Sequence, residues 1–152
     1  MVEITGHSRD SIDVAELAAF THQAYGRLPI PYKYGETREE ITAFLESARN
    51  CPDFIALARA RGALQGWAGV YHWTDSMAYF LSWHPLVIPP NPAVSQQLVQ
   101  RCIQHTAASG RNRMEVFLMN LTAEYREYAT QCGAIYRAAG MARGYEWNYA
   151  AI

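Results

Sequence analysis

Apolar residues recur along this chain at two spacings, and each spacing predicts one kind of element. Repeats three and four residues apart are typical of amphipathic helices, whereas short runs rich in β-branched and aromatic residues are typical of strands. The predicted helices span residues 10–25, 38–50, 92–109 and 121–133. The predicted strands span residues 2–5, 53–62, 63–73, 77–84 and 114–119, with one or two more within 134–152.

Local signals support the starts of two of these helices. Thr37 followed by Glu40 forms a capping box, which predicts the start of the second helix. Asn91 followed by Pro92 places an N-cap residue before a proline at the first helical position, which is a common way to begin a helix. The segment 27–36 carries two X-Pro steps and is predicted to be an ordered, extended loop.

The order of the elements predicts how the strands pair. The strands between residues 53 and 84 are separated only by turn signals, which indicates an antiparallel meander. Strand 77–84, helix 92–109 and strand 114–119 follow the order of a right-handed crossover, so these two strands are predicted to be parallel neighbours. The length of the chain predicts one α+β domain over residues 1–152.

Composition and charge narrow the range of functions. Thirteen basic against fourteen acidic residues give a net charge of -1 without a long run of either sign, so we expect no nucleic-acid partner. The chain has neither an apolar run long enough for a membrane span nor a secretory leader pattern, so we expect a cytoplasmic protein without a membrane partner. The five histidines are scattered and the three cysteines form no C-x-x-C pair, so we expect no metal.

Two segments resemble motifs of the GNAT superfamily of N-acetyltransferases. The sequence GWAGVYHW, residues 66–73, is similar to the third strand of that family, and residues 117–141 are similar to its closing motif. In that motif an Asn precedes a helix that carries Ala and Tyr before a Gly-aromatic step. The corresponding residues here are Asn120, Ala123, Tyr128 and Gly133, while Ala134 replaces the aromatic residue. A rival register places residues 136–141 on the Gly-aromatic step.

The resemblance covers essentially the whole chain and implies a fold and an activity. The implied fold is a mixed, twisted sheet of six to seven strands with helices on both faces. The implied activity is transfer of an acetyl group from acetyl-CoA to an amine of a small molecule or a peptide. The aromatic C-terminal segment, residues 144–152, is also compatible with a strand-mediated homodimer.

The same resemblance implies roles for several side chains. Tyr128 is expected to protonate the departing thiolate of CoA, since it occupies the position of the family's tyrosine in the last helix, and Tyr125 lies on a neighbouring face. From their positions, at the ends of two strands that flank the presumed cleft and in the turn between them, His72, His84 and Asp75 are candidates for the base that takes the proton of the amine, directly or through water. The alternative for each is a purely structural role.

The tyrosines near the first interhelical loop are candidates for the acceptor site. In the family this loop roofs the acceptor pocket, and the residues here are Tyr25, Tyr32 and Tyr34. The alternative is that they are packing residues in a loop stiffened by prolines.

The segment 87–98 raises the question of whether the chain binds acetyl-CoA at all. The family holds the pyrophosphate on backbone N–H groups at a helix N-terminus, and glycines allow the close approach. Here the turn before the helix is residues 87–89 or residues 83–85, and glycine follows neither. This region instead carries four prolines, at positions 85, 89, 90 and 92, which have no N–H to donate. The expected cofactor contacts are Val87, Ala93, Val94, Ser95, Gln96 and Asn120. The alternative is an ordinary capped helix, so two functions stay open: an N-acetyltransferase, or a non-catalytic binding module of the same fold.

Overall fold

The structure is a computed structural model, and it describes residues 1–28, 30, 34–80, 85–117, 127 and 144–145. The strands are β1 Val2–Ser8, β2 Phe54–Ala60, β3 Ala63–His72, β4 Met77–Phe80, β5 Leu86–Val87, β6 Arg113–Phe117 and β7 Gly144–Tyr145. The helices are η1 Arg9–Ser11 (a short 3-10 helix), α1 Val14–Tyr25, α2 Arg38–Glu46 and α3 Pro92–Ala108.

The described strands form one mixed sheet. Its order is β1-β2-β3-β4-β6-β7, and β5 pairs with β3 beside β4. The strands from β1 to β4 pair antiparallel, whereas β4 and β6 pair parallel from Met77 opposite Arg113 to Phe80 opposite Val116. The predicted meander and the predicted parallel pair are therefore both confirmed over the described residues.

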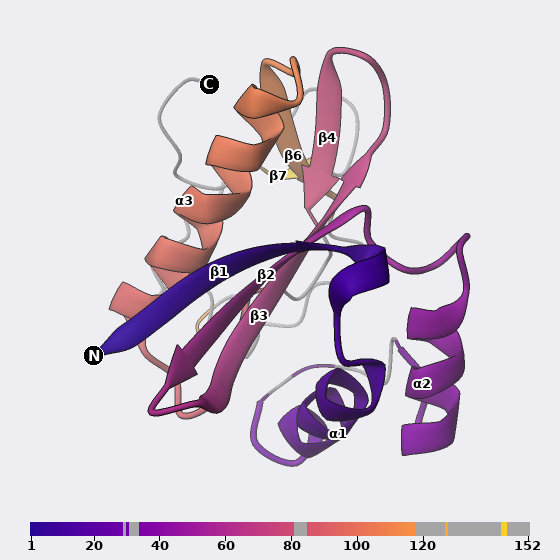
Figure 1. Ribbon diagram of the computed structural model, residues 1–152, viewed down its shortest axis with the longest axis vertical. Helices are drawn as coiled ribbons and strands as arrows, with labels where there is room; N and C mark the ends of the chain where they lie inside the picture. The colour runs from indigo at the N-terminus through magenta and orange to yellow at the C-terminus, as the bar shows by residue number, and fades with distance from the viewer. Residues whose placement is uncertain (29, 31–33, 81–84, 118–126, 128–143, 146–152) are drawn as a thin grey trace.

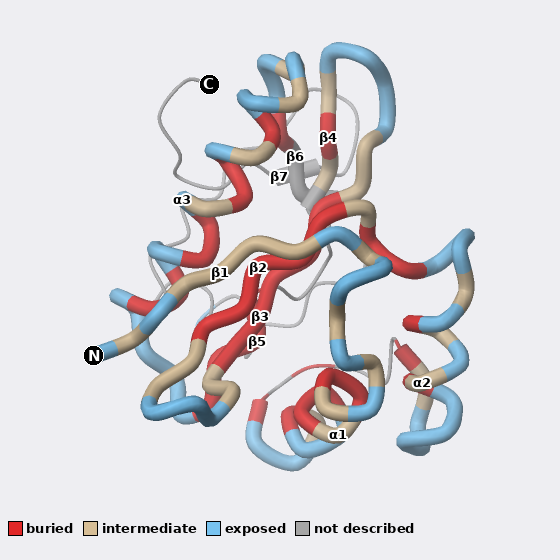
Figure 2. Tube along the Cα trace, in the orientation of Figure 1, coloured by how far each residue is buried: buried red, intermediate tan, exposed pale blue. Residues whose placement is uncertain are grey.

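Helices cover both faces of this sheet. Figure 1 shows α3 on one side of the central strands and α1 with α2 on the other. Because β2 lies between them, its residues from Phe54 to Ala58 are all buried, which explains its unbroken apolar start. Figure 2 shows the buried stretches of β2 and β3 running through the middle of the molecule.

β1 and α2 end at different residues from those predicted, and α1 begins at Val14 instead of residue 10, after the short helix η1. β1 continues to Ser8, beyond the predicted end at residue 5, because its whole length pairs with β2. The helix α2 stops at Glu46, before the predicted end at residue 50, because Ser47 adopts an extended backbone and its carbonyl accepts the N–H groups of Asn50 and Cys51.

A break in the strand next to β3 is the main irregularity of the sheet. Phe80 of β4 lies opposite Val70, and Leu86 of β5 lies opposite Trp67. Five residues, 81–85, therefore separate β4 from β5, whereas only Ala68 and Gly69 separate their partners in β3. Among the described strands β5 pairs with β3 alone, so the parallel pairing of β4 with β6 has no continuation along β5.

Gly66 makes this arrangement possible. A Cβ atom at this position would lie 2.7 Å from the carbonyl oxygen of Leu86 and 2.9 Å from a methyl group of Val87. Both distances are shorter than real contacts, so only glycine lets β5 approach β3 so closely.

Trp67, the next residue, connects α1 with the sheet through a hydrogen bond. Its side chain is completely buried, and its indole N–H donates a hydrogen bond of 3.1 Å to Oγ1 of Thr21 in α1. The Thr21 hydroxyl in turn donates to the carbonyl of Leu17 at 2.8 Å. One hydroxyl thus joins the helix to the indole inside the core.

Replacement of Thr21 by valine keeps the shape of the side chain but removes the acceptor of the indole N–H. We expect the free energy of unfolding to fall by about 1 to 3 kcal/mol, the usual cost of losing a buried hydrogen-bond partner. Urea denaturation of the two proteins measures this difference.

Thr42→Val is the matched control. The Thr42 hydroxyl donates to the carbonyl of Arg38, four residues earlier, but it lies at the surface of α2 and holds no second element. Its replacement should change the stability by no more than about 0.5 kcal/mol. Equal losses in both variants would contradict the role assigned to Thr21.

Candidate functional site

The first turn of α3 holds the backbone amides that sequence analysis assigned to a phosphate. Asn91 is the N-cap, and its side-chain oxygen accepts the N–H groups of Ala93 at 3.1 Å and Val94 at 3.3 Å. The N–H of Ser95 donates to the carbonyl of Asn91 at 3.0 Å, and Pro92 has no N–H. This end of the helix therefore has its donors satisfied within the chain.

The remaining candidates around this turn differ in exposure. Val87 is buried in β5, and Gln96 lies on the exposed side of α3. The hydroxyl of Ser95 is completely buried and has no hydrogen-bond partner among the described residues. Buried hydroxyls nearly always have a partner, so this oxygen is the unusual feature of the turn.

Two of the three candidate tyrosines lie together beside α1. The backbone N–H of Tyr34 donates to the hydroxyl oxygen of Tyr25 at 3.1 Å. The ring of Tyr34 is buried and packs against Phe44 and Trp67, at centroid distances of 5.3 and 6.2 Å. Burial, with smaller effects from Tyr71 and Tyr25, raises the pKa of Tyr34 well above its usual value. The ring of Tyr34 therefore belongs to the core, and its hydroxyl keeps its proton.

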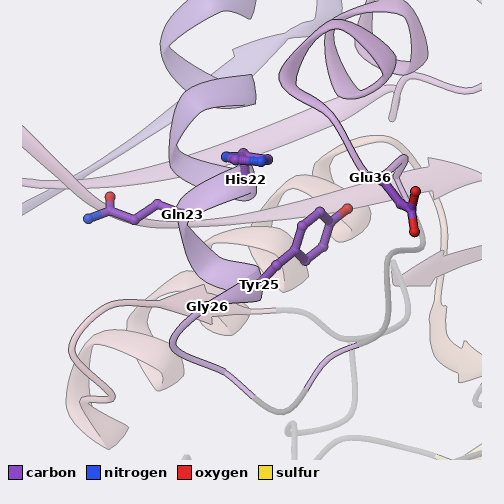
Figure 3. Close-up of a pocket in the computed structure, with 5 residues that line it drawn as sticks. All are labelled: His22, Gln23, Tyr25, Gly26 and Glu36. Carbon is purple, nitrogen blue, oxygen red and sulfur yellow. The ribbon is translucent and has the colours of Figure 1, made fainter.

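Tyr25 lines a hollow of about 420 Å³ at the C-terminal end of α1. The described residues around it are His22, Gln23, Tyr25, Gly26 and Glu36. Figure 3 shows the ring of Tyr25 between the helix and the carboxylate of Glu36. Sequence analysis identified Tyr25 but missed His22 and Glu36. The spacing of His22 and Tyr25, three residues apart on a helix, was the available signal for the first, because such residues share a face.

His72 is placed away from this hollow. It ends β3 on the face that α3 covers, and its Nε2 lies 2.9 Å from Nε2 of His105 in α3. The ring of His105 also stacks on Phe54 at a centroid distance of 3.9 Å. The backbone N–H of His72 donates to the carboxylate of Asp53 at 2.8 Å. The structure thus joins His72 to α3, whereas Tyr25 and Tyr34 lie beside α1 on the opposite face.

Both histidines of this pair resist protonation. Burial is the main cause, and it lowers the pKa of His105 to about 4, with further contributions from His72 and two arginines. Burial also lowers the pKa of His72, followed by the positive charge of Arg111. The hydrogen bond between the two rings needs a donor nitrogen on one and an acceptor nitrogen on the other. At least one ring must therefore be neutral, because a protonated imidazole has no acceptor.

Several predicted site residues lie outside the described part of the chain. These are Tyr128, His84, Asn120 and Tyr32, together with Tyr125 of the last predicted helix. Glu127, within that predicted segment, is helical, and Asp75 lies exposed in the turn between β3 and β4.

The described part of the chain contains neither a metal-binding cluster nor a membrane-spanning helix. No group of three or more His, Cys, Asp or Glu side chains in this part of the chain could hold a metal ion. No helix within it is both long enough and apolar enough to cross a membrane.

Comparison with solved structures identifies the fold. A ribosomal-protein-alanine N-acetyltransferase from Brucella melitensis biovar Abortus 2308 superposes with a TM-score of 0.60 at 14% identity, over 100% of this chain and 99% of the other. PaiA N-acetyltransferase from Thermoplasma acidophilum, in complex with coenzyme A, gives a TM-score of 0.60 at 13% identity, over 93% and 94% of the chains.

A third structure, an aminoglycoside acetyltransferase from an uncultured soil metagenomic sample in complex with sisomicin, gives a TM-score of 0.57 at 12% identity, over 86% of both chains. Scans against family models and curated protein sequences found no match. The structural likeness shows that this chain has the GNAT fold, as the resemblance of residues 66–73 and 117–141 implied.

The histidine pair leads to a prediction about pH. The pKa of His105 is lower in the folded protein than its usual 6.5, so the unfolded chain binds protons first when the pH falls. Stability should therefore be constant above about pH 7 and decrease between about pH 6.5 and 4. Because both rings are partly open to solvent, we expect a loss of about 1 to 2 kcal/mol.

Urea denaturation at about pH 7.5 and about pH 5 measures this loss. His105→Phe preserves the stacking on Phe54 and should remove most of the difference between the two values. His22→Gln, at an exposed position, is the control and should leave the difference unchanged. A His105→Phe protein with the same pH dependence as the native protein would exclude the pair as its source.

Proposed function

We propose that this chain is an acetyl-CoA-dependent N-acetyltransferase that acts on an amine of a small molecule or a peptide. The observation that carries this proposal is the sheet geometry of the described strands, in which β6 pairs with β4 up to Phe80 while β5 pairs with β3 and with no other described strand. A strand that loses its neighbour leaves backbone N–H and C=O groups for an extended ligand. The pantetheine arm of acetyl-CoA, an extended chain with amide groups, suits such a site.

The structural neighbours support the donor and the acceptor class. The neighbour in complex with coenzyme A supports acetyl-CoA as the donor. An aminoglycoside acetyltransferase and a ribosomal-protein-alanine N-acetyltransferase support an amine acceptor, one by a small molecule and one by a protein. This support comes from the fold alone, so the identity of the acceptor has to be argued from the residues of the site.

The reaction we propose is direct attack of a neutral amine on the thioester. A C–N bond forms and the C–S bond breaks, while a base takes a proton from the amine and an acid gives one to the departing thiolate. We assign the acid to Tyr128 from its place in the closing motif and the base to His84. His72 is the weaker candidate for the base, since its Nε2 already lies against His105.

The start of α3 offers a phosphate group fewer donors than most helix N-termini. Asn91 occupies two amides, and Pro92 has none to offer. The buried hydroxyl of Ser95 is the polar group in this turn without a partner among the described residues, and it suits a ligand oxygen. We therefore expect acetyl-CoA to bind with a Kd in the millimolar range unless the Asn91 side chain moves away.

This cap also favours the second candidate function. A GNAT-fold module that binds a partner without catalysis has no need of free amides at α3. Calorimetric titration with acetyl-CoA distinguishes the two functions: a measurable Kd, in the millimolar range or tighter, supports the enzyme, and no detectable heat at millimolar ligand supports the binding module.

Asn91→Gly provides a sharper test of the cofactor site. The substitution frees two amides and costs only a few tenths of a kcal/mol in helix capping, because glycine is itself a tolerated N-cap. A hydrogen bond to a charged acceptor contributes about 1.5 to 3 kcal/mol, so acetyl-CoA should bind at least about tenfold more tightly. Calorimetry measures the change.

Thr37→Gly is the matched control for this experiment. Thr37 caps α2 by accepting the N–H of Glu40 at 3.1 Å, so the substitution removes a cap of the same kind elsewhere in the chain. It should leave the affinity for acetyl-CoA unchanged. A weaker or unaltered affinity in Asn91→Gly would show that the pyrophosphate does not bind at this turn.

The proposed acid is tested by Tyr128→Phe. Removal of the hydroxyl should reduce kcat by about 10² or more, the usual contribution of acid-base catalysis, with little change in the affinity for acetyl-CoA. Steady-state kinetics and titration measure the two quantities. Unchanged turnover would exclude Tyr128, and a loss in Tyr125→Phe or Tyr136→Phe would move the role to that residue.

A further inference from the structure

The hollow at the end of α1 has the composition of a site for an organic cation. Among its five described residues Glu36 is the one acidic residue, and none is Lys or Arg. The carboxylate of Glu36 has no hydrogen-bond or ion-pair partner among the described residues, although the backbone N–H of Glu36 donates to Glu40. Its volume of about 420 Å³ lies within the range of small-molecule sites.

The aromatic wall of the hollow is held in place. The hydroxyl oxygen of Tyr25 accepts the backbone N–H of Tyr34, and the ring of His22 meets the ring of Tyr25 edge to face at 6.4 Å. Figure 3 shows the Tyr25 ring and the Glu36 carboxylate on two sides of the same space. A carboxylate beside aromatic side chains is a combination that binds ammonium groups, through charge attraction and contact with the rings.

A chain of contacts connects this hollow with the strand break. Tyr25 bonds to Tyr34, the ring of Tyr34 packs on Trp67, and Trp67 lies opposite Leu86 of β5. A ligand group at Glu36 therefore lies on the same face of the sheet as Tyr34 and the indole of Trp67.

We infer that this hollow binds a second, non-reacting ammonium group of the acceptor, so that the acceptor carries at least two amino groups. The attacking nitrogen must be neutral when it reaches the thioester. An ammonium beside a carboxylate is stabilised in its charged form and keeps its proton, so the group bound at Glu36 is not the one that attacks. This inference rests on the proposed function, and it narrows the acceptor to diamines and polyamines or to molecules that carry them.

Binding to the purified chain in the absence of acetyl-CoA tests the site independently of catalysis. The probes are 1,4-diaminobutane, 1-aminobutane and 1-butanol, which share a carbon chain and differ in charge. We expect 1,4-diaminobutane to bind most tightly and 1-butanol not at all, and the affinity of the diamine to fall as salt is raised. Glu36→Gln should lower the affinity for 1,4-diaminobutane by about five- to tenfold, the scale of one charge-assisted contact.

Glu46→Gln is the matched control, because Glu46 is an exposed glutamate at the end of the neighbouring helix α2 and lies outside the hollow. This substitution changes the net charge of the protein equally, and it should lower the affinity for 1,4-diaminobutane by less than about twofold. Glu36 is exposed, so both variants should keep the thermal midpoint of the native protein. Equal weakening in the two variants, or a diamine that binds no better than 1-butanol, would overturn the inference.

An acetyl-transfer assay separates this inference from the proposed function. If the chain is an acetyltransferase, kcat/KM for 1,4-diaminobutane should exceed that for 1-aminobutane by about tenfold, and Glu36→Gln should abolish this preference. Transfer without any preference for the diamine would overturn the inference and leave the function standing. Loss of diamine binding in Glu36→Gln together with no transfer to any amine would leave the cation site standing and count against the function.

Discussion

The close approach of β5 to β3 at Gly66 is the constraint on which the rest of the structure depends. Because no Cβ atom fits between this residue and the backbone of Leu86, the chain can return to β3 after the break and pair there at a new register. The return sets the point from which the chain reaches Asn91 and begins α3. It also separates β5 from the parallel pair of β4 and β6, which makes this part of the sheet a candidate for an extended ligand.

Trp67 carries the same constraint to the opposite face. β5 packs against the neighbouring Gly66, while the indole of Trp67 donates a hydrogen bond to Thr21 of α1 and packs against the ring of Tyr34. The backbone N–H of Tyr34 then holds the hydroxyl of Tyr25 at the edge of the hollow. The position of the hollow is thus a consequence of packing on a single buried indole, and the features of both faces meet at two adjacent residues of β3.

The start of α3 combines two physical demands that compete. A helix N-terminus with free amides binds anions, but the same free amides destabilise the helix unless a side chain or a ligand satisfies them. Here the Asn91 side chain satisfies two of these amides, so the first turn of α3 is stable without a bound anion. The buried hydroxyl of Ser95 is the exception, because its burial carries a desolvation cost that no described residue offsets.

The sequence alone determined the features that depend on neighbours in the chain. The capping residues Thr37 and Asn91, the meander and the parallel pair follow from spacing, turn chemistry and the handedness of crossovers, and all four are present in the structure. These rules involve a few residues or the order of elements, so no knowledge of the packing is needed to apply them. The GNAT fold itself was implied by the resemblance of residues 66–73 and 117–141 to motifs of that family.

The tertiary structure decided which distant side chains meet. His72 faces His105 and not Tyr25, because the face on which a strand residue lies depends on the register of the whole sheet. Glu36 lies by Tyr25 because Tyr34 packs on Trp67, a contact that joins residues with no regular spacing in the chain. The register shift between β4 and β5 likewise reflects the space beside Gly66, which the backbone provides only after the strands have assembled.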